Sequence, residues 1–146
     1  MDCVSLEKVE IPESVTRIYT YAFNGCTSLN EVNIPSGIIT IEANVFQKCT
    51  SLKNIELHEE IGEIEACAFQ ESGLEYIDAA HVGSIGVGAF SGCVNLKEVV
   101  LGDTYLENDT FNNCTIEKIH YAGTTYADAW FEYHTPGAEL VKYTLE

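Results

Sequence analysis

The sequence has little positive charge and no long hydrophobic run. Only 7 of its 146 residues are lysine or arginine, against 23 aspartates and glutamates, which gives a formal net charge of −16. Such a chain repels phosphate backbones and anionic lipid, so nucleic-acid and membrane-surface binding are disfavoured, and cationic proteins or metal ions are the natural complement. No apolar run approaches the roughly 20 residues that span a bilayer, so we expect no membrane insertion. No signal peptide is visible at the N-terminus.

The motifs of common catalytic and zinc sites are also missing. The sequence contains no G-x-S-x-G elbow, no H-E-x-x-H pair, no phosphate loop and no dinucleotide fingerprint. Its six cysteines never form the close C-x₂-C pairs that structural zinc sites use. We therefore expect no catalytic residue, no cofactor and no metal site. An enzyme or a metal-dependent protein is the least favoured of the functional alternatives.

What the sequence does contain is a repeat. A short phrase built on A-F-x-G-C-x-S-L returns five times, with phenylalanines that lie 23, 23, 21 and 21 residues apart: Phe23, Phe46, Phe69, Phe90 and Phe111. A fixed period of this length is the signature of a stacked array of structural units.

Each repeat unit carries two short apolar segments. Nine or eight residues after each phenylalanine, apolar residues alternate as in a half-buried strand, for example Val32 with Ile34 and Ile55 with Leu57. A second apolar position lies five residues before each phenylalanine. Gly or Asn precedes the cysteine position in three of the five phrases, which suggests a left-handed turn there. These patterns predict a right-handed α/β solenoid of about six coils, with a parallel sheet on one face and helical or 3₁₀ turns elsewhere.

Five of the six cysteines hold one repeat position. Side chains in a single column cannot surround a tetrahedral metal, and parallel side chains in register rarely meet the torsion of a disulfide. We therefore expect this column to consist of buried thiols that act as small hydrophobes, with Cys67 off the column and more exposed. The column residues are Cys3, Cys26, Cys49, Cys93 and Cys114.

The phrase L-x-x-[VI]-x-[IL]-P, followed by V-x-x-I-x-x-x-A-F-x-G-C-x-S-L, resembles the BspA-like leucine-rich repeat. The resemblance implies a leucine-rich-repeat solenoid over residues 1–121 and a C-terminal cap over residues 122–146, with Trp130 and Phe131 as a hydrophobic lid. It also implies an extracellular or cell-surface location and a role in adhesion or in binding host and matrix proteins.

Strand positions that point away from the core form two rows on one face. We expect this face to bind a protein partner through a basic segment, or to bind divalent cations weakly, because carboxylates concentrate there beside one exposed aromatic residue. The candidate partner-binding residues are Glu10, Glu31, Asn33, Asn54, Glu56, Tyr76, Asp78 and Glu98. Two alternatives stay open: the acidic rows serve only solubility, or the repeats are a structural spacer in a larger surface protein.

The sequence begins partway through a repeat, with Cys3 and Leu6 but no preceding phenylalanine. Solenoids normally cover their end coils. We therefore expect either a fragment of a longer array or self-association through the N-terminal coil.

Overall fold

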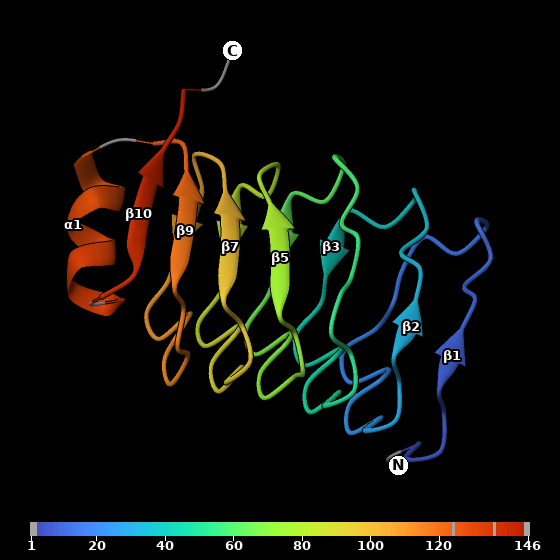
Figure 1. The fold of residues 1–146 in the computed structure, drawn as a ribbon. Helices are drawn as coiled ribbons and strands as arrows, with labels where there is room; N and C mark the ends of the chain where they lie inside the picture. Colours follow the sequence, from blue (N-terminus) through green and yellow to red (C-terminus); the bar gives the residue numbers. More distant parts are fainter. Residues whose placement is uncertain (1–2, 124, 136, 145–146) are drawn as a thin grey trace.

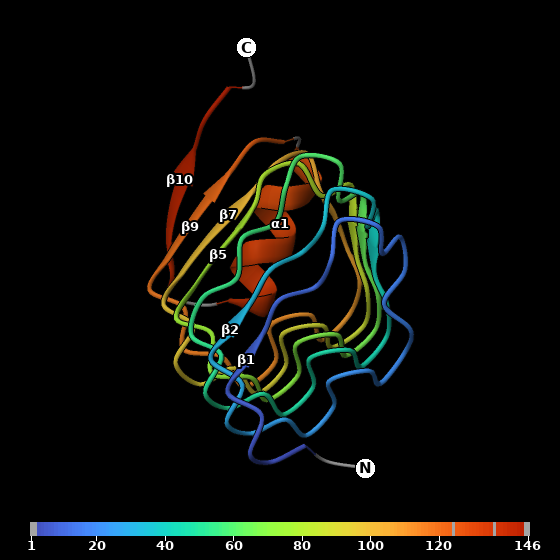
Figure 2. The ribbon, with the colours of Figure 1, turned by 90° about the vertical axis from the view of Figure 1, so that its right-hand side faces the viewer.

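Two parallel sheets run along opposite sides of a stack of coils (Figures 1 and 2). The computed structural model describes residues 3–123, 125–135 and 137–144. The front sheet contains the longer strands and is interrupted once. One part pairs β1 with β2, and the other has the order β10-β9-β7-β5. Its strands are β1 (Lys8–Val9), β2 (Glu31–Val32), β5 (Tyr76–Ala79), β7 (Glu98–Leu101), β9 (Lys118–Tyr121) and β10 (Glu139–Lys142).

The second sheet has the order β3-β4-β6-β8, and each of its strands has two residues. In each strand the second residue is buried in the core and the first points outward, as the period of two requires. The register brings Ile41 level with Ile64, Ile64 with Ile85 and Ile85 with Leu106. This sheet confirms the second apolar edge expected from the sequence. Its strands are β3 (Thr40–Ile41), β4 (Glu63–Ile64), β6 (Ser84–Ile85) and β8 (Tyr105–Leu106).

The phenylalanines of the repeat form a stacked ladder through the core. Neighbouring ring centroids lie 5.4–5.5 Å apart with planes within 15° of parallel. The rings of Phe46, Phe69 and Phe90 are fully buried. Because each coil contacts mainly its neighbours, one coil alone would leave these rings in water, and stacking is what removes them from it.

The turns around each phenylalanine are successive tight turns rather than helices. Hydrogen bonds such as Ala22 N to Tyr19 O (3.0 Å) and Cys26 N to Phe23 O (3.1 Å) span three residues. No helix forms within residues 3–123. The sequence predicted helical or 3₁₀ turns, and the structure has tight turns instead, which is a minor difference. A helical run cannot continue because each phrase has two left-handed residues, one two positions before the phenylalanine and one two positions after it. The first set is Tyr21, Asn44, Cys67, Gly88 and Asp109, and the second is Gly25, Lys48, Glu71, Gly92 and Asn113.

The cysteine column lies beside the phenylalanine ladder. The thiols of Cys49, Cys93 and Cys114 donate to the carbonyl oxygens of Phe23, Phe69 and Phe90 in the preceding coils, with Sγ–O distances of 3.0–3.1 Å. Burial raises the pKa of the Cys49 and Cys114 thiols to about 12, so both stay protonated. Ser72, three residues after Phe69, takes the cysteine position in its coil, which is the fourth. Its Oγ lies 3.3 Å from Cys93 Sγ.

The helix α1 (Thr125–His134) lies across the C-terminal end of the stack (Figures 1 and 2). Its Trp130 and Phe131 are buried, and they contact Phe111 and Tyr121 edge-on. After the helix, β10 pairs with β9 in register over four residues, which adds one strand to the front sheet. The helix α1 and strand β10 thus cover the last coil and extend the sheet beside it.

Candidate partner-binding face

The outward side chains of the front sheet define what we call the strand face. In one row Tyr76 lies level with Glu98, and Glu98 with Lys118. In the parallel row Asp78 lies level with Val100, and Val100 with His120. All eight candidate residues lie on strand-face segments: seven are exposed and Glu98 is partly exposed. The structure therefore places all eight on the strand face, and their role in partner binding stays a prediction.

Basic and histidine side chains contact some carboxylates of this face, and these contacts are unevenly distributed. Glu98 Oε1 lies 2.8 Å from His120 Nε2, and Lys118 Nζ lies 3.2 Å from Glu139. At the other end Lys8 is shared between Glu31 at 2.7 Å and Glu10 at 3.4 Å. These two carboxylates raise the pKa of Lys8, with the Glu31 hydrogen bond as the larger cause.

Glu56 and Asp78 occupy the middle of the strand face, and among the described residues no basic side chain pairs with either. Asp78 accepts a hydrogen bond from the backbone N–H of Ala80 at 3.1 Å. The acidic excess of the face therefore lies over its N-terminal coils and its centre.

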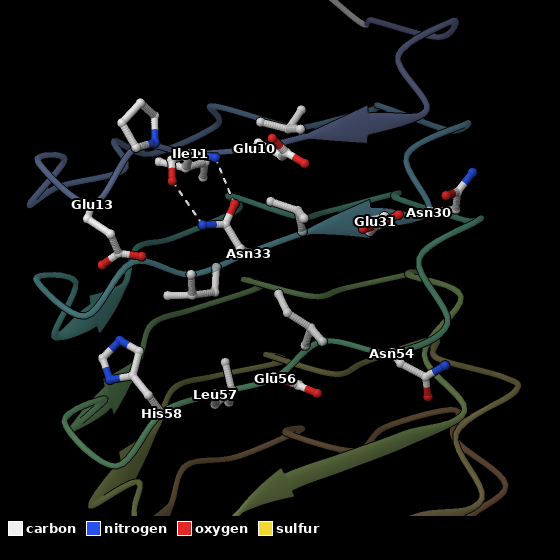
Figure 3. A pocket seen from close by; sticks show the side chains of 15 residues that line it. Glu10, Ile11, Glu13, Asn30, Glu31, Asn33, Asn54, Glu56, Leu57 and His58 are labelled. Carbon is white, nitrogen blue, oxygen red and sulfur yellow. Dashed lines mark hydrogen bonds between the residues drawn. The ribbon is translucent and has the colours of Figure 1, made fainter.

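Asn33 makes an intramolecular bridge that the sequence pattern did not predict. Its side-chain Oδ1 accepts from Ile11 N at 2.7 Å, and its Nδ2 donates to Ile11 O at 2.9 Å (Figure 3). The ladder between β1 and β2 ends at the pair Val9 and Val32. Pro12 and Pro35, a few residues further along each strand, have no N–H to continue it. The Asn33 amide replaces that missing ladder pairing.

The front sheet is interrupted at the third coil. Residues 54–57 form no strand, and no backbone hydrogen bond joins them to residues 30–34 within the described chain. One backbone bond, Glu75 N to Lys53 O at 2.9 Å, connects the start of this segment to the fourth coil. The repeat shortens in the next coil, since one residue fewer separates Phe69 from Leu74 than separates Phe46 from Leu52. Gly73 permits the shortening, because a Cβ there would lie 2.1 Å from Thr50 O.

A hollow of about 1020 Å³ lies over these first three coils (Figure 3). Its apolar part includes Val32, Ile34 and Leu57, which are only partly buried. The residues at the same repeat positions in the next two coils are buried: Ile77 and Val99 for Val32, and Ala79 and Leu101 for Ile34 and Leu57. Its polar part includes Asn54 and four carboxylates: Glu10, Glu13, Glu31 and Glu56. The interruption of the sheet and the hollow thus coincide with the acidic end of the strand face.

Two residues that line the hollow, Glu13 and His58, were not singled out from the sequence. Glu13 accepts hydrogen bonds from Ser36 N and Ser36 Oγ, both at 3.2 Å. His58 Nε2 lies 3.0 Å from Pro35 O, and its Nδ1 is buried with no hydrogen-bond partner in the structure as described. The sequence could have pointed to His58, because this histidine occupies the repeat position that proline holds in the first two coils, at Pro12 and Pro35.

Tyr76 stands on β5, in the coil next to the hollow, with 40% of its surface exposed. Partial burial, followed by the nearby carboxylates of Asp78 and Glu98, raises the pKa of its hydroxyl. The hydroxyl therefore stays protonated at neutral pH and can act as a hydrogen-bond donor. Tyr76 is thus an amphipathic contact at the centre of the strand face.

Across residues 3–123, 125–135 and 137–144, no group of three His, Cys, Asp or Glu side chains comes together to hold a metal ion. None of the helical residues in those ranges forms a segment long and apolar enough to cross a bilayer.

The coil stack with parallel strands and repeated apolar ladders defines a leucine-rich-repeat solenoid. The sequence profile of the BspA type leucine-rich repeat region matches residues 1–118 in six copies, so the chain belongs to this family. No curated protein matches the chain significantly.

Solved structures with the same fold come from several bacteria. A leucine-rich repeat protein from Bacteroides ovatus aligns with 97% of this chain and 38% of its own (TM-score 0.76, 24% identity). The Treponema pallidum leucine-rich repeat protein aligns with 94% of this chain and 72% of its own (TM-score 0.74, 24% identity). A leucine-rich cell surface protein from Faecalibacterium prausnitzii aligns with 98% of this chain and 56% of its own (TM-score 0.53, 18% identity). At these identities the likeness establishes the fold, and the chain spans well under half of the Bacteroides protein.

Proposed function

We propose that the chain is a protein-binding module of a cell-surface or secreted protein, which uses its strand face and has no chemistry of its own. The observation that supports this most is the strand face itself, where exposed carboxylates and Asn54 line a hollow and Tyr76 is exposed on the neighbouring coil. Membership of the BspA type family and the cell-surface description of the Faecalibacterium protein are consistent with such a role.

The partner that fits this face has a basic segment. Opposite charges speed encounter and select partners, while buried aromatic contacts supply much of the affinity. Glu31, Glu56 and Asp78 would attract the segment, and Tyr76 would provide the apolar contact. A divalent cation, bound weakly by the same carboxylates, is the alternative ligand. Such a cation would compete with a basic protein for the face.

The experiment that tests this proposal is a solid-phase binding assay. The chain is immobilised and presented with a panel of matrix and host-surface proteins, with and without calcium. A variant with Glu31→Gln, Glu56→Gln and Asp78→Asn should associate more slowly with any protein that the parent retains. The difference should shrink with added salt, because the screening length falls from about 10 Å at 0.1 M to about 3 Å at 1 M.

A spacer role predicts a different outcome. A spacer would show no saturable binding to any member of the panel, and the triple variant would behave as the parent does. The regular stacking of the coils also suits a spacer, because an array of this kind holds its ends at a fixed separation. Binding that persists unchanged in the triple variant at low salt would show that the strand face is merely solvated.

A further inference from the structure

The hollow over the first three coils differs from the rest of the strand face in its backbone. From β5 to β10, every pair of neighbouring strands is joined in register over four residues. Residues 54–57 lack such partners on the side of the second coil, within the described chain. Backbone N–H and C=O groups need hydrogen-bond partners once water is excluded. A ligand seated in the hollow can therefore find main-chain donors and acceptors that the other coils have already used.

The charge of the hollow also differs from that of the neighbouring surface. Its lining includes Glu10, Glu13, Glu31 and Glu56 but no lysine or arginine. Lys8 lies beside it and pairs with two of these carboxylates. From β7 to β10, by contrast, Glu98 lies beside His120 and Glu139 lies beside Lys118. A cationic occupant suits the hollow, whereas an anionic or a purely apolar one does not.

The spacing of the carboxylates indicates the shape of the occupant. Glu10 and Glu56 hold the same repeat position two coils apart, which is roughly 11 Å at the 5.5 Å spacing of the Phe23 and Phe46 rings. An extended polyproline II segment repeats every three residues, about 9.3 Å, with all of those side chains on one side. A β-strand places same-side residues about 6.7 or 13 Å apart, which matches this separation less well.

We propose that the hollow binds an extended basic peptide segment that lies across the first three coils, with lysine or arginine at every third residue facing Glu10 and Glu56. This proposal rests on the proposed binding function and specifies where on the strand face the partner binds and what the bound segment looks like. The partly buried Val32, Ile34 and Leu57 would contact the aliphatic stems of the basic side chains. Asn54 and the main chain of residues 54–57 would supply hydrogen bonds.

The test uses a labelled synthetic peptide of about nine residues, with lysine at every third position and proline between, titrated into the full chain by fluorescence anisotropy. A second peptide has the same composition with its three lysines adjacent. The variant Glu10→Gln/Glu56→Gln removes the two negative charges that the lysines of the peptide would face. The matched control Glu59→Gln/Glu60→Gln removes two exposed charges of the third coil that do not line the hollow. Asn54→Trp fills the hollow without changing charge, and circular dichroism verifies the fold of each variant.

We expect saturable binding of the spaced peptide and at least about threefold weaker binding of the clustered one. Glu10→Gln/Glu56→Gln and Asn54→Trp should each weaken the spaced peptide about fivefold or more, and the control pair should leave it unchanged. Equal weakening by the two charge-removing pairs would overturn the proposal, since binding would then follow net charge alone. Undiminished binding by a folded Asn54→Trp variant would also overturn it.

Failure of this proposal is distinguishable from failure of the proposed function. A protein partner whose binding is abolished by Tyr76→Ala but unaffected by Asn54→Trp would place the contact on β5 and β7. The strand face would then still be the binding surface, and the hollow would not be its site. A partner insensitive to every strand-face variant would overturn both.

Discussion

The indole of Trp130 stands edge-on to the ring of Phe111, with ring centroids 6.2 Å apart and planes at 79°. Phe111 is the last ring of the ladder, and its inner face is already stacked on Phe90. The indole thus contacts the last ring of the ladder, which has no further phenylalanine of the repeat beyond it. An edge-on contact of this kind is favourable because the positive ring edge meets the negative ring face.

Replacement of Trp130 by alanine should therefore destabilise the array strongly. Trp130 is 6% exposed, and removing a buried aromatic side chain costs about 3–5 kcal/mol in the free energy of unfolding. Urea denaturation followed by circular dichroism measures this loss. Tyr133→Ala is the control on the same helix, because Tyr133 is 81% exposed and its loss should cost no more than about 0.5 kcal/mol. Similar losses in both variants would contradict the assignment of residues 122–146 as a cap.

The Asn33 bridge to Ile11 gives a second prediction. Asn33→Ala removes two hydrogen bonds to the backbone and leaves the N–H and C=O of Ile11 without their partner. We expect a loss of about 1–2 kcal/mol in the free energy of unfolding. Asn54→Ala is the matched control, because the Asn54 side chain makes no hydrogen bond within the described structure. If both alanine variants unfold at the same urea concentration as the parent, the bridge does not contribute to stability.

The thiol column predicts a pattern of chemical labelling. Cys49 and Cys93 are fully buried, and burial raises the pKa of both thiols. The thiolate is the reactive form, so iodoacetamide at pH 8 should label these cysteines only after unfolding. Cys67 is only partly buried and lies outside the column, so it should react in the native state. Mass spectrometry of the labelled peptides tests this order, and rapid native labelling of Cys93 would contradict the packing described above.

Glu42 gives a prediction about pH. Its carboxylate is buried, accepts hydrogen bonds from Thr20 N at 2.9 Å and Thr20 Oγ1 at 3.1 Å, and pairs with Arg17. The Arg17 hydrogen bond is the largest cause that lowers the Glu42 pKa below its ordinary value of 4.5. A lowered folded-state pKa means that ionised Glu42 stabilises the fold above about pH 4.5, and that this stabilisation is lost as the pH falls further.

Glu42→Gln should therefore destabilise the chain at pH 7, and the difference from the parent should shrink as the pH falls below about 4.5. Urea denaturation over a series of pH values measures it. Glu63→Gln, at an exposed position on strand β4, is the control and should change the free energy of unfolding by no more than about 0.5 kcal/mol at pH 7. A Glu42→Gln effect that stays constant down to acidic pH would show that the ion pair is not responsible.

Sequence periodicity predicted the coils and their ladders well, because every coil repeats the same apolar positions. It also indicated the left-handed residue after each phenylalanine from Gly25, Gly92 and Asn113. The other left-handed column was missed, since Tyr21 and Cys67 hold it in two coils and neither residue signals a positive φ. Backbone conformation there is imposed by the bonds between neighbouring coils, such as Tyr21 N to Ala43 O.

The candidate face was only partly predictable. Alternation showed which side chains point outward, but it could not show that Asn33 bonds to Ile11 or that Lys8 lies between two glutamates. The interruption of the sheet was not visible either, because Ile55 and Leu57 follow the same alternation as the strands that do pair. Pairing depends on the distance between coils, which one repeat read alone does not contain.

The thiol bonds give the array a mechanical direction. The thiols of Cys49, Cys93 and Cys114 each donate to the coil before them, so the coils of Phe23, Phe69 and Phe90 are each secured by a contact from the next coil. A force that pulls the two termini apart loads these contacts in series. Coils should then detach one at a time, and each 21–23-residue event should release about 70–80 Å of extended chain. The stack would yield in steps under tension, with a step length that its repeat sets.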